Sequence, residues 1–146
     1  MTILAFALSA VLLLITALHV YWGIGGIWPG RDAASCARAV VGTRGVSEMP
    51  PTFACFAVAA CLVLATLWPL ALMGVFATPF PQQGLAATSV MIALVFFGRG
   101  MLGFTPWWRR QTPEQPFARL DRSLYSPLCL LIGAGFAIIG ISQFPT

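Results

Sequence analysis

The sequence predicts an all-α integral membrane protein: a four-helix bundle that forms a single transmembrane domain over residues 1–146. Three observations predict this fold class. Hydrophobic residues make up 59% of the chain and charged residues only 8%, whereas about a quarter of the residues in a soluble domain are charged. The hydrophobic residues form continuous runs, and four of these are long enough to cross a bilayer. Seven of the eight arginines lie in the two longest segments between these runs.

Each predicted span contains about the 20 apolar residues that a helix needs to cross the hydrocarbon core. The first run lacks the basic residues that precede the hydrophobic region of a signal peptide, and it is longer than such a region, so we expect it to be retained as a span. Proline leads into the second run at Pro51 and into the fourth at Pro127, where a helix start tolerates it. The predicted spans are residues 3–23, 52–76, 85–104 and 127–144.

The arginines predict how the spans are oriented. Residues 24–51 hold three arginines and residues 105–126 hold four, whereas the connection at residues 77–83 has no charged side chain. Because basic residues favour the cytoplasmic side, we expect both long loops in the cytoplasm and both termini to be extracytoplasmic. Each loop is expected to be structured and to contain a short interfacial helix, one over residues 32–41 and one that begins with a capping box at Thr112.

Composition disfavours several classes of function. The net charge of +4 comes from arginines split between two loops, which fits anionic lipid headgroups better than a nucleic acid. The four cysteines form no CxxC pair and the chain has one histidine, so we expect no metal site and no cofactor. The cysteines fit packing positions instead. Ala57, Cys61 and Ala65 lie on one helix face, which predicts a close contact between helices.

Arg99 lies inside the third predicted span and is the strongest indication of a functional site in the sequence. A guanidinium stays protonated at accessible pH, and a charge within the bilayer is costly. Three interpretations remain open. The side chain reaches the lipid phosphates along its own stem, it pairs with Glu48 or Asp121 as a structural clamp, or its planar fork binds an anionic ligand.

Other reactive side chains are expected at the depth of Arg99, near the cytoplasmic boundary. His19 and Arg99 lie at similar distances along spans that run in the same direction, which predicts one shared site. Tyr125 and Ser126 precede the fourth span on the same side. We interpret the histidine either as a partner in a hydrogen bond between helices or as a proton-transfer group, since histidine titrates near neutral pH.

Two motifs carry a resemblance to a known family. The first span ends in His-x-Tyr-Trp-x-x-Gly-Gly over residues 19–26, and Arg-x-Asp-Arg-x-x-Tyr-Ser-Pro-Leu-Cys over residues 119–129 leads into the fourth. With these motifs the chain resembles a family of small bacterial four-span integral membrane proteins catalogued as a domain of unknown function. The resemblance implies a multi-pass protein of the bacterial inner membrane. It also directs attention to six side chains of these motifs: His19, Tyr21, Trp22, Asp121, Tyr125 and Ser126. Together with Arg99 and Glu48 from the argument above, they are the candidate ligand-binding residues.

Three classes of function remain open. The first is a small membrane protein that binds or transports a lipophilic or amphipathic ligand with an anionic head, at a pocket on the cytoplasmic side, with membrane lipids as its partners. The second is a membrane-embedded enzyme with His19 as acid or base and Arg99 or Tyr125 stabilising negative charge. The third is a structural or accessory subunit. Assembly into a homo-oligomer is open in all three. The predicted spans contain no carboxylate and the loops no glycine-rich phosphate motif, so we favour the first class over an enzyme.

Overall fold

The computed structural model describes residues 1–144, and the secondary structure of these residues is entirely helical. This confirms the predicted all-α fold class. Within these residues four helices are long and apolar enough to cross a membrane, as expected of a multi-pass membrane protein. They are α1 (Thr2–Gly23), α3 (Thr52–Leu72), α4 (Gln82–Leu102) and a last helix that runs over Phe117–Ile141.

The last membrane helix has three parts. α6 (Phe117–Leu120) continues into a π-helical turn, η1 (Asp121–Tyr125), and then into α7 (Ser126–Ile141). It therefore begins at Phe117 and not at the predicted boundary, Pro127. Proline has no N–H to donate to the carbonyl four residues before it. Here the chain forms a wider π turn directly before Pro127 and the helix runs on through it.

The loops contain two short helices, α2 (Ala33–Val40) and α5 (Pro106–Gln111). Asp32 caps α2, because its carboxylate accepts the Ser35 N–H over 2.7 Å while the Ser35 hydroxyl accepts the Asp32 N–H over 3.0 Å. The helix predicted over residues 32–41 is thus confirmed. The helix start predicted at Thr112 is wrong: its hydroxyl donates to the carbonyl of Trp108 over 3.0 Å and so closes α5.

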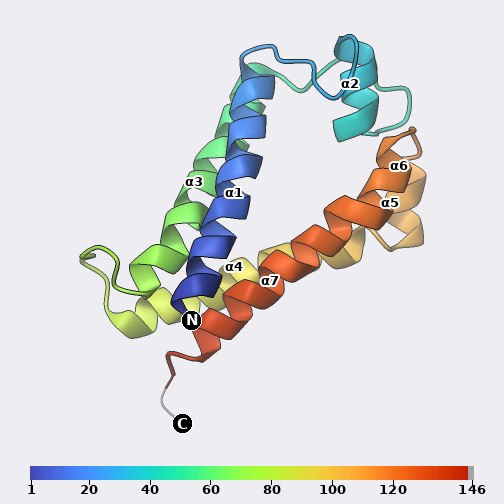
Figure 1. Ribbon diagram of the computed structural model, residues 1–146. Helices are drawn as coiled ribbons and strands as arrows, with labels where there is room; N and C mark the ends of the chain where they lie inside the picture. The colour runs from blue at the N-terminus through green and yellow to red at the C-terminus, as the bar shows by residue number, and fades with distance from the viewer. Residues whose placement is uncertain (145–146) are drawn as a thin grey trace.

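The four membrane helices form two antiparallel hairpins. α1 packs along α3, and α4 packs along α7. Figure 1 shows that the hairpins meet at the end that holds both chain termini and diverge toward the loops, where α2 lies across the gap. We refer to these two ends of the molecule as the terminal end and the loop end.

An apolar core joins the hairpins at the terminal end. Leu12 and Phe136 are fully buried in this core, and the ring of Phe136 stacks on that of Phe96 with 6.1 Å between their centroids. A polar contact also links α3 to α4, since Trp68 donates from Nε1 to the carbonyl of Leu85 over 3.0 Å. These contacts fix the two hairpins to each other beside the termini.

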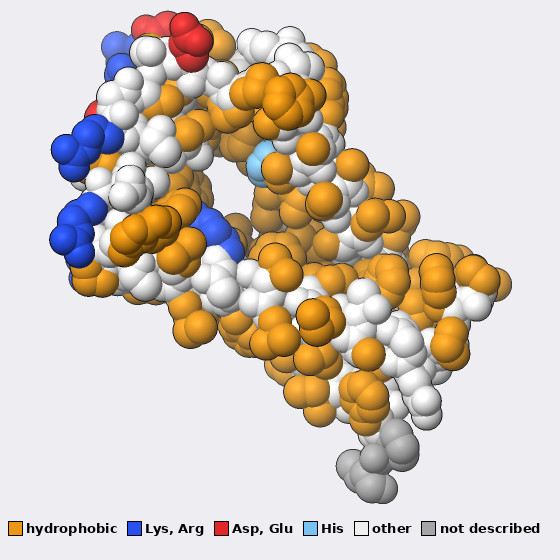
Figure 2. Space-filling view, turned by 180° about the vertical axis from the view of Figure 1, so that it is seen from behind, with side chains coloured by type: hydrophobic (Ala, Val, Ile, Leu, Met, Phe, Trp, Pro, Cys, Tyr) orange, Lys and Arg blue, Asp and Glu red, His pale blue; other side chains and the backbone are white. Residues whose placement is uncertain are grey.

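At the loop end the two loops bind each other directly. The Glu114 N–H donates to the carbonyl of Gly42 over 3.2 Å, and the Gly45 N–H donates to Oε1 of Glu114 over 2.9 Å. Gly42 has a φ of +70°, and a Cβ at this position would lie 2.2 Å from the ring of Phe117, so the crossing requires glycine. The hairpins, joined at both ends, enclose an opening that the space-filling view shows between them (Figure 2).

Candidate functional site

A polar cluster lies where the last turn of α4 meets the π turn of the last helix. Arg99 donates from Nη2 to Oδ1 of Asp121 over 2.6 Å. The Asp121 side chain is 4% exposed and that of Arg99 is 32% exposed. Among the interpretations of Arg99, the structure shows the ion pair with Asp121. Glu48 is exposed on the first loop and forms no ion pair within the described residues.

Asp121 is held by three donors. Besides Arg99, the Ser126 hydroxyl donates to Oδ1 over 3.2 Å and Trp108 donates from Nε1 to Oδ2 over 3.0 Å. The Ser126 hydroxyl in turn accepts Nη1 of Arg99 over 3.3 Å. A buried carboxylate needs such partners because its desolvation is otherwise costly. These four residues, which we refer to as the Arg99 cluster, tie α4 and α5 to the last helix.

The π turn brings Asp121 and Ser126 to the same side of the helix. In an α-helix, residues five apart are rotated by about 140° around the axis, because each residue advances the helix by about 100°. In η1 the Ser126 N–H donates instead to the carbonyl of Asp121, five residues earlier. The wider turn therefore lets both side chains reach Arg99.

Gly103 lies against the cluster, and neither Gly103 nor Trp108 was among the predicted site residues. A Cβ at Gly103 would lie 1.8 Å from Oγ of Ser126 and 2.8 Å from Oδ2 of Asp121, so the absent side chain makes room for both. The ring centroid of Trp108 lies 5.0 Å from Cζ of Arg99, a cation–π distance. In the sequence, Gly103 stands one helical turn after Arg99, but this spacing is equally typical of ordinary helix packing.

A groove of about 490 Å³ lies between the hairpins and reaches Arg99. We refer to it as the α3–α4 groove. Among the described residues, Arg99 is the single charged one in its wall. The other residues that line the groove are Ala57, Val58, Cys61, Leu62 and Ala65 of α3 and Ile92, Val95 and Phe96 of α4.

The small residues of α3 line the groove and do not form the close helix contact that the sequence predicted. Ala57 and Cys61 are exposed, and only Ala65, nearer the terminal end, is buried. The prediction is wrong at the first two positions because the hairpins diverge there (Figure 1). Small side chains at this place leave room for a molecule between the helices.

Arg99 keeps hydrogen-bonding capacity beyond its ion pair. A guanidinium has five N–H donors, of which one is engaged by Asp121 and one by Ser126. The other three have no hydrogen-bond partner among the described residues. A third of the Arg99 side chain is exposed, and Arg99 forms part of the groove wall.

His19 lines a second, smaller pocket of about 290 Å³ next to the groove. Its Nδ1 lies 2.8 Å from the carbonyl of Ile15. A carbonyl only accepts, so in the neutral ring Nδ1 carries the proton and Nε2 is left as an acceptor. Val58 lines both the pocket and the groove, which therefore adjoin along α3. A single site for His19 and Arg99 stays a prediction.

Comparison with known families agrees with the resemblance noted in the sequence. A family model described as "Protein of unknown function (DUF3995)" matches residues 12–136. The chain belongs to this family. The region matched by the DUF3995 model contains His19, the α3–α4 groove and the whole Arg99 cluster. No curated protein and no solved structure matches the chain.

Other residues of the two motifs position the loops of this DUF3995 protein. Trp22 donates from Nε1 to the carbonyl of Trp28 over 2.7 Å, and the Tyr21 hydroxyl accepts the Trp28 N–H over 3.3 Å. Tyr125 donates from its hydroxyl to the carbonyl of Ala39 in α2 over 3.2 Å. The structure thus brings Arg99, Asp121 and Ser126 together, and it places Tyr21, Trp22 and Tyr125 at contacts that hold the loop end.

Proposed function

We propose that the protein binds a lipophilic or amphipathic molecule in the α3–α4 groove, with the tail along the apolar wall and the polar head at Arg99. The observation that carries the proposal is the composition of this groove, in which eight apolar residues and Arg99 form the wall. Mostly apolar pockets with a few convergent polar groups are typical of small-molecule sites. Binding is the step that the geometry supports, whereas transport requires a second arrangement of the hairpins.

The dimensions of the groove suit a hydrocarbon chain. On α4 the wall extends from Ile92 to Arg99, seven helical steps apart, which corresponds to about 10 Å of helix. A fully extended chain advances roughly 1.2 Å per bond, so a segment of about eight carbons covers this length. A lipid tail already lies in hydrocarbon before it binds, and the groove gains little by burying it. Contacts between the head and Arg99 therefore decide which molecule is selected.

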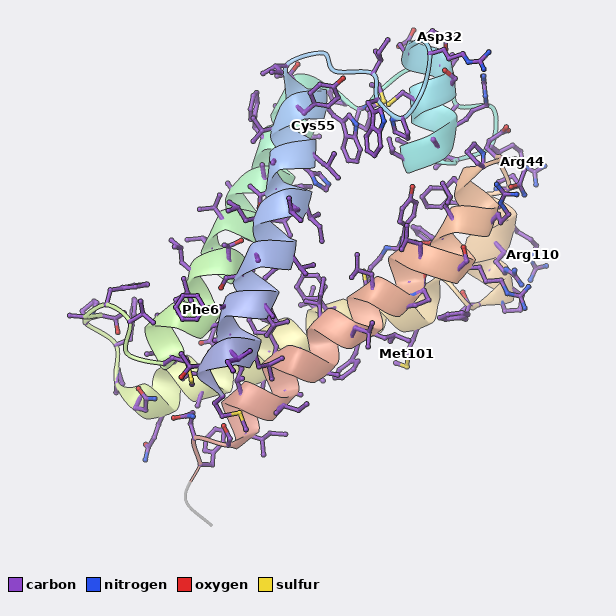
Figure 3. All side chains as sticks on the ribbon, viewed as in Figure 1. Phe6, Asp32, Arg44, Cys55, Met101 and Arg110 are labelled. Carbon is purple, nitrogen blue, oxygen red and sulfur yellow. The ribbon has the colours of Figure 1, made fainter. Side chains whose placement is uncertain are left out.

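We further propose that the loop end lies in the cytoplasm and that the membrane is the bacterial inner membrane. Basic side chains gather over the loops at one end of the molecule (Figure 2), and Arg44 and Arg110 point away from the opening (Figure 3). Basic loops favour the cytoplasmic side, where they meet anionic headgroups. A ligand head at Arg99 would then lie near the inner leaflet.

Photo-crosslinking tests the proposal. A single-chain lipid with a diazirine in its tail is incorporated into phosphatidylcholine nanodiscs with the protein, and mass spectrometry maps the labelled residues after illumination. We expect labelling to concentrate on the residues of α3 and α4 that line the groove, and not on the other exposed residues of the same helices. Labelling spread evenly over every lipid-facing helix contradicts the proposal.

A pair of matched variants sharpens this test. Ala57→Phe fills the groove from an exposed position of α3 and should reduce groove labelling several-fold. Ala60→Phe makes the same change at an exposed position of the same helix that does not line the groove, and it should label like the wild type. Equal labelling of the two variants would exclude the groove as the binding site.

A structural or accessory role is the second candidate, and the Arg99–Asp121 pair itself favours it. The pair links α4 to the last helix, as a clamp would. This role predicts that Ala57→Phe and Ala60→Phe behave alike in every assay and that lipid labelling shows no preference for the groove.

A further inference from the structure

We infer that Asp121 sets the charge selectivity of the α3–α4 groove, so that the head bound at Arg99 is an uncharged group with hydrogen-bond acceptors, such as a carbonyl, ester or hydroxyl oxygen. This inference rests on the proposed function and narrows it. It replaces the anionic head that the sequence alone led us to expect.

The first step is the charge balance at the head site. Asp121 lies 2.6 Å from Arg99 and is almost fully buried, so its negative charge is held beside the guanidinium and is poorly screened by water. Arg99 is the single charged residue that the described part of the chain contributes to the groove wall. The pair therefore presents no net charge to the groove.

The second step concerns an anion placed at the remaining Arg99 donors. Such an anion would share the guanidinium with the Asp121 carboxylate, and two like charges that close disfavour each other. Within residues 1–144, no second cation lines the groove to offset this repulsion. The Ser126 hydroxyl and the Trp108 N–H both donate to Asp121 and so hold the carboxylate in place. An anionic head is therefore opposed by a fixed negative charge.

The third step concerns what the site still offers. Three N–H groups of Arg99 have no partner among the described residues, and each donates to an oxygen whether or not that oxygen carries a charge. An uncharged acceptor gains these hydrogen bonds without opposing Asp121. The site thus selects for acceptor oxygens and against free anions.

Two probes that differ only in a phosphate separate these alternatives. One is a monoacylglycerol with a diazirine in its tail, and the other is the lysophosphatidic acid with the same tail. Both are placed at equal concentration in phosphatidylcholine nanodiscs, and the ratio of their groove labelling is measured for each variant. We expect the wild type to favour the monoacylglycerol, and Asp121→Asn to shift the ratio about tenfold toward the lysophosphatidic acid because the Arg99 charge is then uncompensated.

A charge-matched control is available in Glu48→Gln. It removes one negative charge from an exposed loop position that makes no ion pair within the described residues, so the labelling ratio should stay within about twofold of the wild type. A shift that is equal in Glu48→Gln and Asp121→Asn reflects overall charge and overturns the inference.

The wild-type protein provides a second measurement in case Asp121→Asn is not stable. Monoacylglycerol labelling of the groove should be independent of salt between 50 and 500 mM (roughly a threefold change in Debye length). A wild type that favours lysophosphatidic acid, with labelling that falls as salt rises, overturns the inference but leaves the proposed function intact. Groove labelling by neither lipid overturns the proposed function itself.

Discussion

Replacing Gly103 with alanine tests whether the Arg99 cluster is packed as closely as its geometry indicates. The new Cβ would lie 1.8 Å from Oγ of Ser126 and 2.8 Å from Oδ2 of Asp121. Neither distance is tolerated, so the Ser126 side chain or the helix that carries it must move. In both cases Ser126 loses its hydrogen bonds to Arg99 and Asp121.

The size of the effect follows from three contributions. Forcing a methyl group into a packed site costs about 1–3 kcal/mol. Losing the hydrogen bonds between Ser126 and two charged groups costs about 1.5–3 kcal/mol more. Alanine offsets about 0.5–1 kcal/mol of this because it loses less backbone freedom than glycine on folding. We therefore expect Gly103→Ala to lower the free energy of unfolding by about 2–5 kcal/mol, or the melting temperature by at least about 5 °C.

Gly98 provides the matched control for this measurement. It lies on the same helix, and a Cβ there would meet no atom within 4 Å. Gly98→Ala should leave the melting temperature unchanged or raise it slightly. Thermal unfolding of both variants is followed by intrinsic tryptophan fluorescence in one detergent. If the two variants melt together, the cluster is looser than the structure indicates and the reasoning fails.

Three further outcomes are expected. Arg99→Leu leaves the buried Asp121 without its cation and should lower the free energy of unfolding by about 3 kcal/mol. This is the low end of the range for breaking a buried ion pair, because a third of the Arg99 side chain is exposed. Adding Asp121→Asn should recover most of this loss, and a double variant no more stable than Arg99→Leu contradicts the pairing. A periplasm-active reporter fused to the C-terminus should give a signal and a cytoplasm-active one should not; the reverse would place the loop end outside. The backbone N–H and hydroxyl of Ser35 hold the pKa of Asp32 below its usual value. The Asp32 carboxylate therefore stabilises α2 fully above the unfolded pKa of about 3.9, and this stabilisation is lost as the pH falls through the lower folded pKa. Amide protection in α2, relative to exchange of the unfolded chain at the same pH, should therefore fall below about pH 4 in the wild type but not in Asp32→Asn, which caps without titrating. An equal loss of protection in both would rule out this cause.

The membrane helices were predictable because a bilayer admits few structures. A segment within hydrocarbon must satisfy its backbone internally, so hydropathy alone located α1 at Thr2–Gly23 beside the predicted 3–23. Local rules failed where two structures compete for the same residues. The sequence from Thr112 onward resembles a helix start. In the structure, however, the Thr112 hydroxyl donates to the Trp108 carbonyl at the end of α5. Pro127 resembles a boundary, but the π turn lets the helix continue.

The pairing of the helices could not be predicted. In a membrane, the surface that faces lipid is as apolar as the surface that faces another helix, so no polar face marks the exterior. Ala57 and Cys61 fit a helix contact and a groove wall equally well in the sequence. The partner of Arg99 was open for a similar reason, since Glu48 and Asp121 both lie a few residues outside a predicted span. The π turn decided it, because the rotation that aims Asp121 at Arg99 depends on local backbone geometry.

The Arg99–Asp121 pair is a costly way to hold two helices together. Buried ion pairs can often be replaced by apolar residues without loss of stability. α4 and α7 already approach closely elsewhere, where Gly133 leaves room beside the carbonyl of Ala93. A clamp alone therefore does not account for a guanidinium at the edge of an apolar groove with three N–H groups unengaged by the described residues. Asp121 compensates the charge on one edge of the guanidinium, and we propose that the remaining donors serve a head at the edge of the groove. By this reasoning the ion pair and the proposed head site are one arrangement, which places hydrogen-bond donors in an apolar wall without a net charge.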